Sequence, residues 1–499
     1  MLLGIDLGAG SLKATLISGD DGRVLGEGSH PVTTHMPHHG WSEQDPGEWF
    51  QALCRAVPLA LKASGVGAGA LQGIAISAGA HIPVLLDDTG TVLRPAIMWN
   101  DQRASREAAE LREHHGALIE STSLNRANPT WALPMLAWLQ RHEPGVIARV
   151  RRFCLPKDYL RWRLTGEWAT DFSDVIGALM ADVNTRDWSP AICQLIDWPM
   201  ETLPPVAEAT AVAGTVTTTA ARDTGLAPGT PVVVGSNDTT VEFFGVGALQ
   251  PGQTAIKLAT AGVLFLAVDR PVVQPPISCY PHIAPGMYYL ATGTNACASA
   301  HRWARDRLFP GESFEAMDAE ATKAPAGSEG VLFHPYLQGE RGPHWDPWLR
   351  ADFLGLTMHH DRPHLARAVY EGIAYSIRDL LTDARDKGLE FGPARLLGGG
   401  GRSELWRQIL ADVTGLVMEI PETADASFGA ALVAGIGVGA FGSPREAVAR
   451  CVRIRHRTRP DAGRHALYGE LFGVYREATR VLAGLDRRLH DILHVQNDA

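Results

Sequence analysis

The stretch that decides the fold is residues 2–17, which read Leu-Leu-Gly-Ile-Asp-Leu-Gly-Ala-Gly-Ser-Leu-Lys-Ala-Thr-Leu-Ile. Two apolar segments, 2–7 and 12–17, flank a turn of small residues, and a third segment follows at 23–28. Short apolar runs separated by glycine-rich turns are typical of neighbouring antiparallel strands. We therefore predict a β-meander that begins at residue 2.

A helix and a further strand follow this meander. Asp45 and Pro46 form a helix start signal, because aspartate caps helices and proline suits the first helical position. Apolar residues then recur at helical spacing over 49–63, and residues 73–77 form a short apolar strand. Strands continue to alternate with helical patterns along the chain, which predicts an α/β class with mixed sheets.

The first hairpin has a weak counterpart in the second half of the chain. Residues 256–262 read Ile-Lys-Leu-Ala-Thr-Ala-Gly and lead into a second apolar segment, as residues 5–11 do. A Gly/Pro-rich stretch at 245–252 precedes this copy and is suited to a domain link. Two similar domains that meet near residue 247 would explain the pattern, but a coincidence of two small-residue turns would also explain it.

Composition narrows the classes of function. The 499 residues include 45 Lys and Arg and 55 Asp and Glu, a formal net charge of −10, and the hydrophobic share is 45%. This balance argues against a nucleic-acid partner, which basic proteins bind by releasing counterions. No basic segment precedes the first apolar residues, and no uncharged apolar run approaches the roughly 18 residues of a membrane span. We expect a cytoplasmic protein without a membrane partner, whose six dispersed cysteines are reduced.

Three turns carry residues that suit chemistry, and each also has a purely structural interpretation. Asp6 ends a strand directly before a small-residue turn, which can cradle a phosphate while the carboxylate holds Mg²⁺ through water. Asp238 follows an apolar strand and begins a predicted helix through Phe244. It can be an N-cap or an exposed general base, and the two interpretations are compatible because a capping position projects the side chain out of the turn. Residues 398–401 are four consecutive glycines between a strand and an amphipathic helix, and they indicate either close approach of a nucleotide or a flexible loop.

Taken together, these residues resemble the FGGY family of carbohydrate kinases, and within it the xylulokinase-like members. The resemblance covers nearly the whole chain and rests on six ordered, dissimilar motifs at 4–8, 40–46, 95–103, 155–160, 339–347 and 398–410. It implies two actin-like (ribonuclease-H-like) domains with mixed sheets flanked by helices and a cleft between them. The implied domains are residues 1–247, which bind the sugar and hold the catalytic aspartate, and residues 248–499, which bind the nucleotide.

The resemblance also assigns roles to single residues. Asp238 would be the base that acts on the sugar hydroxyl, and Asp6 would be the metal-linked carboxylate that faces the γ-phosphate, so that both are candidate Mg²⁺ carboxylates. The residues implied on the sugar side are Ala80, His81, Trp99, Asn100, Asp101 and Arg103. The residues implied on the ATP side are Gly8, Ser11, Lys13, Thr260, Ala261, Gly262, Gly399, Gly400 and Ser403.

Several positions depart from the family pattern. Residues 77–82 read Ser-Ala-Gly-Ala-His-Ile, where xylulokinases usually read Ser-Gly-Gln-Met-His-Gly, so the sugar pocket is expected to differ. Fewer hydroxyl residues line the two phosphate turns than is usual, although backbone N–H groups survive such changes.

The resemblance implies a Mg²⁺·ATP-dependent kinase of a small ketose, with D-xylulose the leading candidate and a homodimer as a possible assembly. A kinase of another pentulose or of a polyol is the alternative within this class. The alternatives outside it are a catalytically silent sugar-binding protein on the same fold and an actin-like chaperone ATPase.

Overall fold

The computed structural model describes residues 1–494, and the chain forms two compact units. The first unit comprises Met1–Leu249, Val268–Leu290 and Thr423–Val452. The second comprises Gln250–Ala267, Ala291–Glu422 and residues from Arg453 onward. The first change of unit lies close to the boundary predicted at residues 247/248, and two later segments join the first unit in addition.

The large sheet of the first unit is built around the predicted meander. Its six strands follow the order β13-β14-β5-β1-β2-β3. β1 pairs antiparallel with β2 and parallel with β5, and β2 pairs antiparallel with β3. The bounds are β1 Leu2–Leu7, β2 Ser11–Ile17, β3 Val24–Pro31, β5 Gly73–Ala78, β13 Val212–Thr215 and β14 Pro231–Val233. The meander and the strand predicted at 73–77 are confirmed.

The other large sheet repeats this arrangement. Its order is β17-β18-β16-β15-β21-β22-β23, so that β15 takes the place that β1 has in the first sheet. β15 pairs antiparallel with β16 and parallel with β21, as β1 does with β2 and β5. The bounds are β15 Thr254–Leu258, β16 Gly262–Val268, β17 Ser278–Pro281, β18 Tyr288–Thr294, β21 Ala394–Leu397, β22 Met418–Pro421 and β23 Ile454–Thr458. The shared order favours duplication over coincidence as the origin of the sequence repeat.

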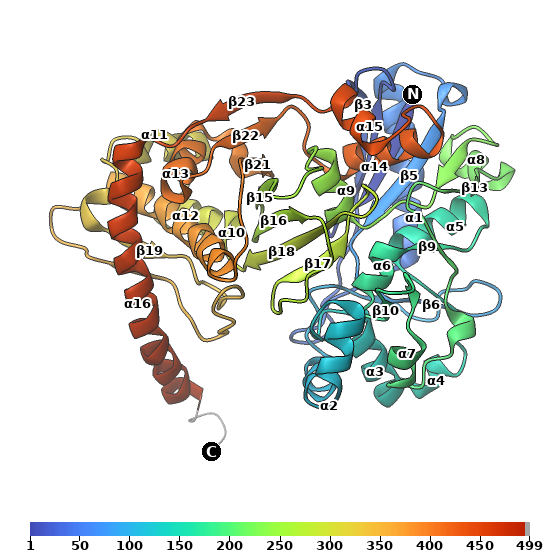
Figure 1. The fold of residues 1–499 in the computed structure, drawn as a ribbon, viewed down its shortest axis with the longest axis horizontal. Helices are drawn as coiled ribbons and strands as arrows, with labels where there is room; N and C mark the ends of the chain where they lie inside the picture. The colour runs from blue at the N-terminus through green and yellow to red at the C-terminus, as the bar shows by residue number, and fades with distance from the viewer. Residues whose placement is uncertain (495–499) are drawn as a thin grey trace. The chain divides into compact units, whose positions relative to one another are not determined.

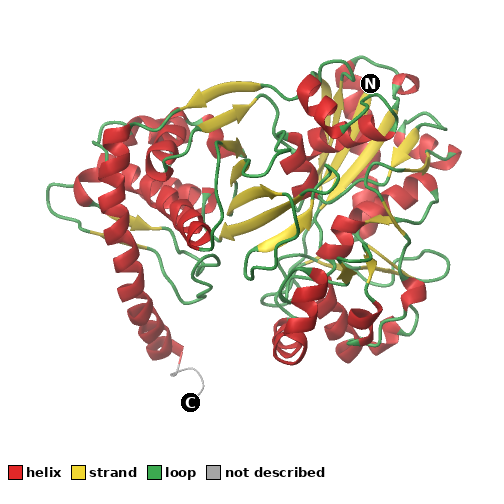
Figure 2. Cartoon of the chain, viewed as in Figure 1, coloured by secondary structure: helices red, strands yellow, loops and turns green. Residues whose placement is uncertain are grey.

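Helices flank both sheets, as Figures 1 and 2 show. Helices of the first unit are α1 Pro46–Ser64, α2 Ser105–Ser123, α3 Ala132–His142, α4 Pro144–Ile147, α5 Pro156–Thr165, α6 Phe172–Gly177, α7 Pro190–Gln194, α8 Thr218–Thr224, α9 Asp238–Gly245, α14 Ala426–Gly437 and α15 Pro444–Cys451. Helices of the second are α10 Ala298–Leu308, α11 Phe314–Ala321, α12 Arg362–Asp386, α13 Glu404–Thr414 and α16 Ala462–His494. The start predicted for α1 is confirmed, since Asp45 caps it by accepting from the Gly47 N–H.

Short strands and 3₁₀ turns complete the described chain. The short strands are β4 Glu43–Gln44, β6 Val84–Leu86, β7 Ala96–Ile97, β8 Arg152–Cys154, β9 Thr170–Asp171, β10 Ala181–Asp182, β11 Asp187–Trp188, β12 Val206–Ala207, β19 Leu332–His334 and β20 Asp352–Leu354. The 3₁₀ turns are η1 Ala68–Ala70, η2 Met200–Thr202, η3 Ser328–Gly330 and η4 Gly399–Arg402.

Helix α14 packs against β1 and β5 of the first sheet and against α9, although about 180 residues separate it from α9 in sequence (Figure 1). Glycines make this close packing possible. A Cβ atom on Gly4 of β1 would lie 1.8 Å from the Ser427 carbonyl oxygen, and one on Gly429 would lie 1.9 Å from the Val241 carbonyl oxygen. Hydroxyl groups add a buried contact, because Thr15 Oγ1 lies 2.7 Å from Ser427 Oγ. The small-residue helix α14 is therefore a packing element of the first unit.

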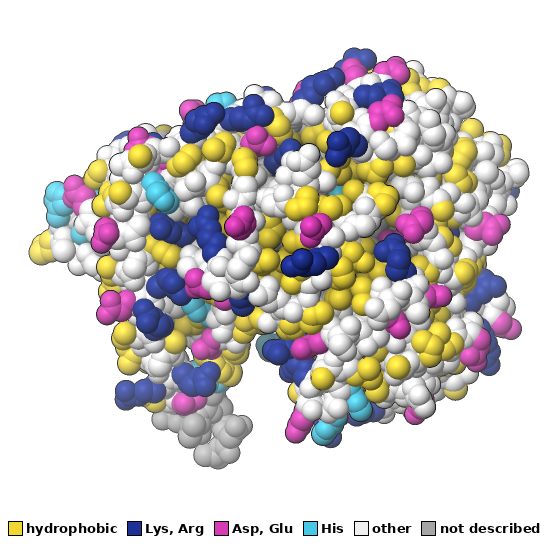
Figure 3. All heavy atoms as spheres, viewed as in Figure 1, with side chains coloured by type: hydrophobic (Ala, Val, Ile, Leu, Met, Phe, Trp, Pro, Cys, Tyr) yellow, Lys and Arg dark blue, Asp and Glu magenta, His cyan; other side chains and the backbone are white. Residues whose placement is uncertain are grey.

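The surface is mixed in charge. On the face drawn in Figure 3, Lys and Arg side chains are interspersed with Asp and Glu side chains. Among residues 1–494, no helix is both long enough and apolar enough to cross a membrane.

A substitution at Gly429 tests the close approach of α14. Gly429→Ala should lower the free energy of unfolding by about 1–3 kcal/mol or more, because its methyl group must displace backbone. Gly116→Ala is the matched control, since a Cβ at this position in α2 meets nothing within 4 Å; it should raise the stability by about 0.5–1 kcal/mol. Urea unfolding followed by circular dichroism measures both, and equal effects of the two substitutions would contradict the packing role.

Candidate active site

The turn after β1 is held in place by side chains from two other elements. Asp6 lies beside Ser77 of the parallel neighbour β5, and its Oδ1 accepts a 2.8 Å hydrogen bond from Ser77 Oγ. Within the turn, the Gly8 N–H donates to the Ser11 carbonyl at 3.0 Å. Gln44 Nε2 donates to the Ala9 carbonyl at 2.7 Å. The predicted phosphate turn is thus an ordered loop, with Asp6 at its base and Ser11 exposed.

Asp238 is the first residue of α9, and the cap of this helix is its neighbour. Asn237 Oδ1 accepts from the Thr240 N–H at 2.9 Å, so the N-cap interpretation of Asp238 is wrong. The Asp238 carboxylate is half-buried, and its Oδ1 accepts from the Thr239 N–H at 2.7 Å. Because Asn237 satisfies the helix start, the Asp238 side chain is left available to face a cavity.

One cavity within the first unit brings several of the predicted residues together. Its lining residues are Leu7, Gly8, Ala9, Gln44, Trp49, Gly79, Ile82, Met98, Trp99, Pro156 and Asp238. The set combines one carboxylate, the backbone of the first phosphate turn and the indole of Trp99, which is 44% exposed. A planar aromatic face beside a carboxylate is an arrangement suited to a polyhydroxylated ligand.

A buried charge cluster lies on the elements next to this cavity. Lys157 Nζ of α5 is 2.6 Å from Asp158 Oδ1, 3.0 Å from Asp171 Oδ1 and 3.0 Å from Asp174 Oδ2. All four side chains are at most 3% exposed, and Arg161 adds a second cation to Asp158 at 3.3 Å. Burial acts to lower the pKa of Lys157, but the three carboxylates outweigh it and raise the pKa above the usual lysine value. Burial raises the pKa of Asp174 well above its usual value.

This cluster is joined by hydrogen bonds to both sides of Asp238. Asp171 Oδ2 accepts from Ser236 Oγ at 2.7 Å and from the Ser173 N–H at 3.1 Å. Ser173 Oγ in turn accepts from Asn237 Nδ2 at 2.8 Å and lies 2.9 Å from Thr240 Oγ1. Side chains before and after Asp238 are therefore bonded to the segment that carries two of the aspartates paired with Lys157.

His81 lies in an aromatic pocket of the first unit. Its ring centroid is 4.1 Å from that of Trp131, and its Nε2 is 2.9 Å from the Tyr280 hydroxyl. Burial lowers the pKa of His81 to about 3, and a hydrogen bond with the Thr130 backbone opposes this only in part. The imidazole is therefore neutral near pH 7 and can act as a hydrogen-bonding group, not as a cation. Ala80, which stands where methionine is usual, is buried next to Gly177. A Cβ added to Gly177 would lie 2.9 Å from the Cβ of Ala80.

The remaining residues predicted on the sugar side divide into two groups. Asn100 is exposed, as Trp99 is. Asp101 is fully buried and accepts from the Ser42 N–H at 2.6 Å and from Arg103 Nε at 2.9 Å. Arg103 also contacts Glu43 at 2.7 Å and stacks on Trp41 at 3.7 Å. These two residues form an internal network and do not line the cavity, and their role as sugar ligands stays a prediction.

Lys13 is engaged by acidic groups of the first unit. Its Nζ lies 2.7 Å from Glu27 Oε1 and 2.9 Å from Asp425 Oδ2, at the start of α14. Burial opposes the charge, but Asp425 and Glu27 raise the pKa of Lys13 above the usual value. The ammonium therefore links β2 to α14, and its contact with ATP stays a prediction.

The second unit contains the counterpart of the first turn. The Thr260 carbonyl accepts from the Cys297 N–H at 3.1 Å and from Ser299 Oγ at 2.8 Å, so the start of α10 orders the turn at 259–261. Gly262 begins β16 where space is short, because an added Cβ would lie 2.7 Å from Thr294 Cγ2. Ala261 lies between these two anchored residues.

The glycine run of the second unit is structured, and the flexible-loop interpretation of it is wrong. Gly398 has a φ of 81° and an added Cβ would lie 2.5 Å from the Leu258 carbonyl, so only glycine fits. Gly400 likewise packs closely on Leu258 and Trp406, whereas Gly399 has nothing within 4 Å of an added Cβ. Ser403 caps α13 by accepting from the Trp406 N–H at 3.1 Å. Open space at Gly399 beside a helix start suits a flat ligand.

Comparisons with known proteins agree with this geometry. Residues 1–245 match the N-terminal domain model of the FGGY family of carbohydrate kinases, and residues 255–438 match its C-terminal domain model. The chain belongs to this family. The xylulose kinase of Escherichia coli strain K12 is 36% identical over 477 residues, which cover 94% of this chain and 96% of that protein.

Solved structures of FGGY kinases share the fold. The crystal structure of a xyloylose kinase from Brucella ovis aligns with a TM-score of 0.89 at 32% identity, covering 97% of this chain and 99% of the other. That of xylulose kinase from Rhodospirillum rubrum aligns with a TM-score of 0.88 at 30% identity, covering the same shares. The predicted actin-like fold class, with mixed sheets flanked by helices, is confirmed for this FGGY kinase.

Several residues around the site were not assigned a role from the sequence. They are Gln44 and Ser77 at the first turn, Trp131 and Tyr280 around His81, and Lys157, Asp171, Ser173 and Ser236 behind Asp238. Gln44 and Lys157 stand in motifs of the family resemblance, which was a signal for their importance. Nothing in the sequence links Tyr280 to His81 across almost 200 residues.

Removal of Lys157 tests the charge cluster of this FGGY kinase. Lys157→Met should lower the free energy of unfolding by about 3–5 kcal/mol, because it leaves buried carboxylates without their shared cation. Lys62→Met, at an exposed position in the last turn of α1, is the control and should change stability by less than about 0.5 kcal/mol. Urea unfolding at pH 7 measures both, and a loss below 1 kcal/mol for Lys157→Met would refute the central place given to the cluster.

The neutral state of His81 predicts a pH dependence of stability. Between pH about 6.5 and about 3, the unfolded chain binds a proton at His81 and the folded chain does not, so stability falls as the pH falls. His81→Gln should remove up to about 1.4 kcal/mol per pH unit from the slope in this window. Buried His282 and His301 titrate in both proteins and cancel in the difference. Unfolding free energies at pH 7, 6 and 5 give the two slopes, and parallel curves would show that His81 is not held neutral.

Proposed function

We propose that this FGGY kinase transfers the γ-phosphoryl group of ATP to a hydroxyl of D-xylulose, giving D-xylulose 5-phosphate. The observation that carries the proposal is the cavity in which Asp238 and Trp99 lie together with the turn at Gly8 and Ala9. The relatives at 36%, 32% and 30% identity, which are named as kinases of this sugar, support the choice of substrate.

Asp238 is the proposed base. Phosphoryl transfer asks mainly that the attacking hydroxyl be oriented and that its proton be accepted late. The Asp238 carboxylate is half-buried and stands on a helix start that the side chains of Ser236 and Asn237 hold in place. A carboxylate in a fixed position can orient the attacking hydroxyl. The carboxylate oxygen that does not accept from the Thr239 N–H can accept the hydroxyl proton.

The donor set around the first turn fits a magnesium ion. Mg²⁺ prefers oxygen ligands and keeps several of its waters, and Asp6 and Asp238 offer half-buried carboxylate oxygens. When bound, the ion would neutralise charge on the phosphate oxygens. Gly8 and Ser11 on the first turn, and Thr260, Ala261 and Gly262 on the second, are the proposed phosphate contacts. The Gly8 N–H itself donates to the Ser11 carbonyl and shapes the turn. Gly399, Gly400 and Ser403 are proposed to border the adenosine.

On the sugar side, we assign direct contact to Trp99, Asn100 and neutral His81. Trp131 holds the His81 ring, and in the proposed complex a sugar hydroxyl replaces the Tyr280 hydroxyl as the partner of Nε2. Asp101 and Arg103 are proposed to act mainly by holding the loop that presents Trp99, since their polar atoms already meet one another. Ala80 stands where methionine is usual in xylulokinases, so kinases of other pentuloses or of polyols are the alternative.

We also propose a cytoplasmic location for the enzyme. The six cysteines are free thiols, which suits a reducing compartment. A homodimer stays a prediction from the sequence.

Coupled ADP release over pentuloses, hexuloses and polyols tests the function. D-Xylulose should give the highest kcat/KM, and Asp238→Asn should lower kcat by about 10²–10⁴ with little change in sugar binding, because an amide cannot accept the proton. Asp88→Asn, an exposed aspartate of the same unit, is the matched control and should leave kcat unchanged.

Other outcomes of this assay would identify the alternatives. Near-normal turnover of Asp238→Asn removes Asp238 from the mechanism. A higher kcat/KM with another sugar replaces D-xylulose as the substrate. ADP release without any sugar at a comparable rate favours a chaperone-type ATPase, and tight sugar binding without phosphorylated product favours a silent binding protein.

A further inference from the structure

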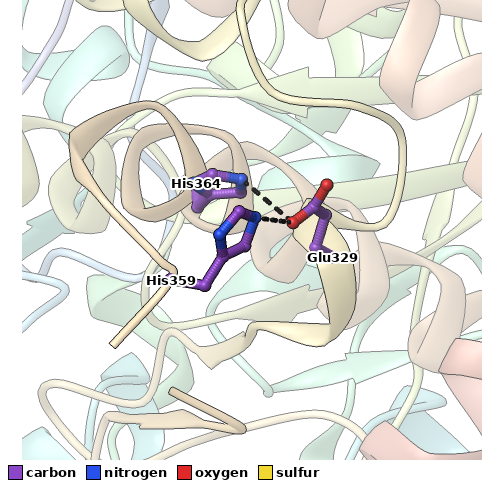
Figure 4. A group of neighbouring side chains, drawn as sticks. All are labelled: Glu329, His359 and His364. Atoms are coloured by element: carbon purple, nitrogen blue, oxygen red, sulfur yellow. Dashed lines mark ion pairs between the residues drawn. The ribbon is translucent and has the colours of Figure 1, made fainter. Parts of the chain in front are cut away.

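Three potential metal ligands lie close together in the second unit. None of them is near a residue of the proposed kinase site in the sequence. Glu329 lies in η3, His359 lies in the loop before α12, and His364 is the third residue of α12. His359 Nε2 is 2.7 Å and His364 Nε2 is 3.6 Å from Glu329 Oε2, as Figure 4 shows. The possible ligand atoms all lie within 4.8 Å of one another.

His364 is oriented by a carboxylate on its other ring nitrogen. Its Nδ1 lies 2.7 Å from Asp361 Oδ1 and 3.2 Å from the Asp361 backbone nitrogen. We assign the proton to Nδ1 because the carboxylate is the nearer partner and only accepts hydrogen bonds. Nε2 then carries the lone pair and points toward Glu329. A carboxylate that fixes the tautomer of a ligating histidine is the usual outer partner in metal sites.

Glu329 is presented by a constrained turn that α12 also holds. Ser328 and Glu329 have φ values of 48° and 50°, which non-glycine residues rarely adopt. The carboxylate of Glu371, buried on α12, accepts from the Gly327 N–H and from Ser328 Oγ, each at 2.9 Å. The turn and His364 are therefore both positioned by one helix, so two of the three ligands are fixed relative to each other.

We propose that Glu329, His359 and His364 bind one divalent transition-metal ion, with Zn²⁺ as the best match. Tetrahedral Zn²⁺ with bonds of about 2.0–2.1 Å separates its ligand atoms by about 3.3 Å, between the two distances found here. Imidazole nitrogens favour zinc, copper and nickel, whereas Mg²⁺ favours oxygen ligands. His359 and Glu329 are 73% and 42% exposed at their side chains, so water can complete the coordination.

The neighbouring His360 is not part of this ligand set. Its Nδ1 accepts from the Thr357 N–H at 2.9 Å, and its Nε2 lies 3.3 Å from the Glu329 carbonyl. Both ring nitrogens thus face backbone. The bound ion would join the η3 turn, the 355–361 loop and the start of α12. Because the unfolded chain cannot offer these three ligands in one place, ion binding should raise the stability of the folded chain.

The competing explanation is that the three side chains form only ion pairs, without a metal. Isothermal titration of the full-length, tag-free and chelator-treated protein with ZnCl₂ separates the two explanations, with MgCl₂ as the contrast. We expect saturation at one Zn²⁺ per chain and no comparable Mg²⁺ binding at this site. His359→Ala and Glu329→Gln should each weaken zinc binding by at least about 10–100-fold.

The matched control is His456→Ala, which removes an exposed histidine of the same unit on β23. It should bind zinc as the unchanged protein does, and zinc should raise the thermal unfolding midpoint of both but not of His359→Ala. Thermal midpoints without metal establish that each variant is folded; His359 is exposed, so its removal should not disturb the fold. No saturable zinc binding, or equal binding by the two ligand variants and the control, overturns the proposal.

Discussion

The unit of this kinase that holds the proposed base, Asp238, depends on one buried cation, Lys157. Lys157 holds three aspartates that would otherwise repel one another in a water-poor interior, and one of them, Asp171, binds the serine that precedes Asn237 and Asp238. Desolvation makes such a cluster costly unless every charge is matched, so its members must stay in register. Hydrogen bonds from Ser236 to Asp171 and from Asn237 to Ser173 connect the cluster to the helix start that carries the proposed base. Electrostatics in the interior thereby fixes geometry at the cavity.

A second constraint on the fold is that glycine must stand where two backbone segments touch. Gly4 and Gly429 let α14 approach the first sheet to backbone contact, and Gly398 lets the glycine turn of the second unit approach β15. Because Asp425 caps α14, the same approach brings a carboxylate to Lys13 beside the first turn. Packing and charge are thus arranged by the same few positions. The two sheets share a strand order, but these close contacts differ between them.

The aromatic pocket of the first unit holds a neutral histidine, His81, and not a charged one. Aromatic rings exclude water around His81 and favour its uncharged form, so it can exchange hydrogen bonds without the cost of burying a charge. Asp101 and Arg103 show the opposite solution, in which opposite charges are buried together and neutralise each other. Glu329 and His359 of the proposed zinc site are exposed, so a metal ion can reach them from water, whereas His364 is buried beside them.

The sequence by itself determined the strands of the first meander, the start of α1, the repeat and the family, because periodicity, capping residues and ordered motifs are local properties of the chain. It also indicated Asp6, Asp238 and the glycine run as chemical positions. Only the tertiary structure decided that Asn237 caps α9, that Asp101 and Arg103 form an internal pair, and that Lys157, Tyr280 and Asp425 belong to the surroundings of the site. These facts depend on contacts between residues up to about 400 positions apart, and no local pattern encodes which distant side chain will neutralise a buried charge.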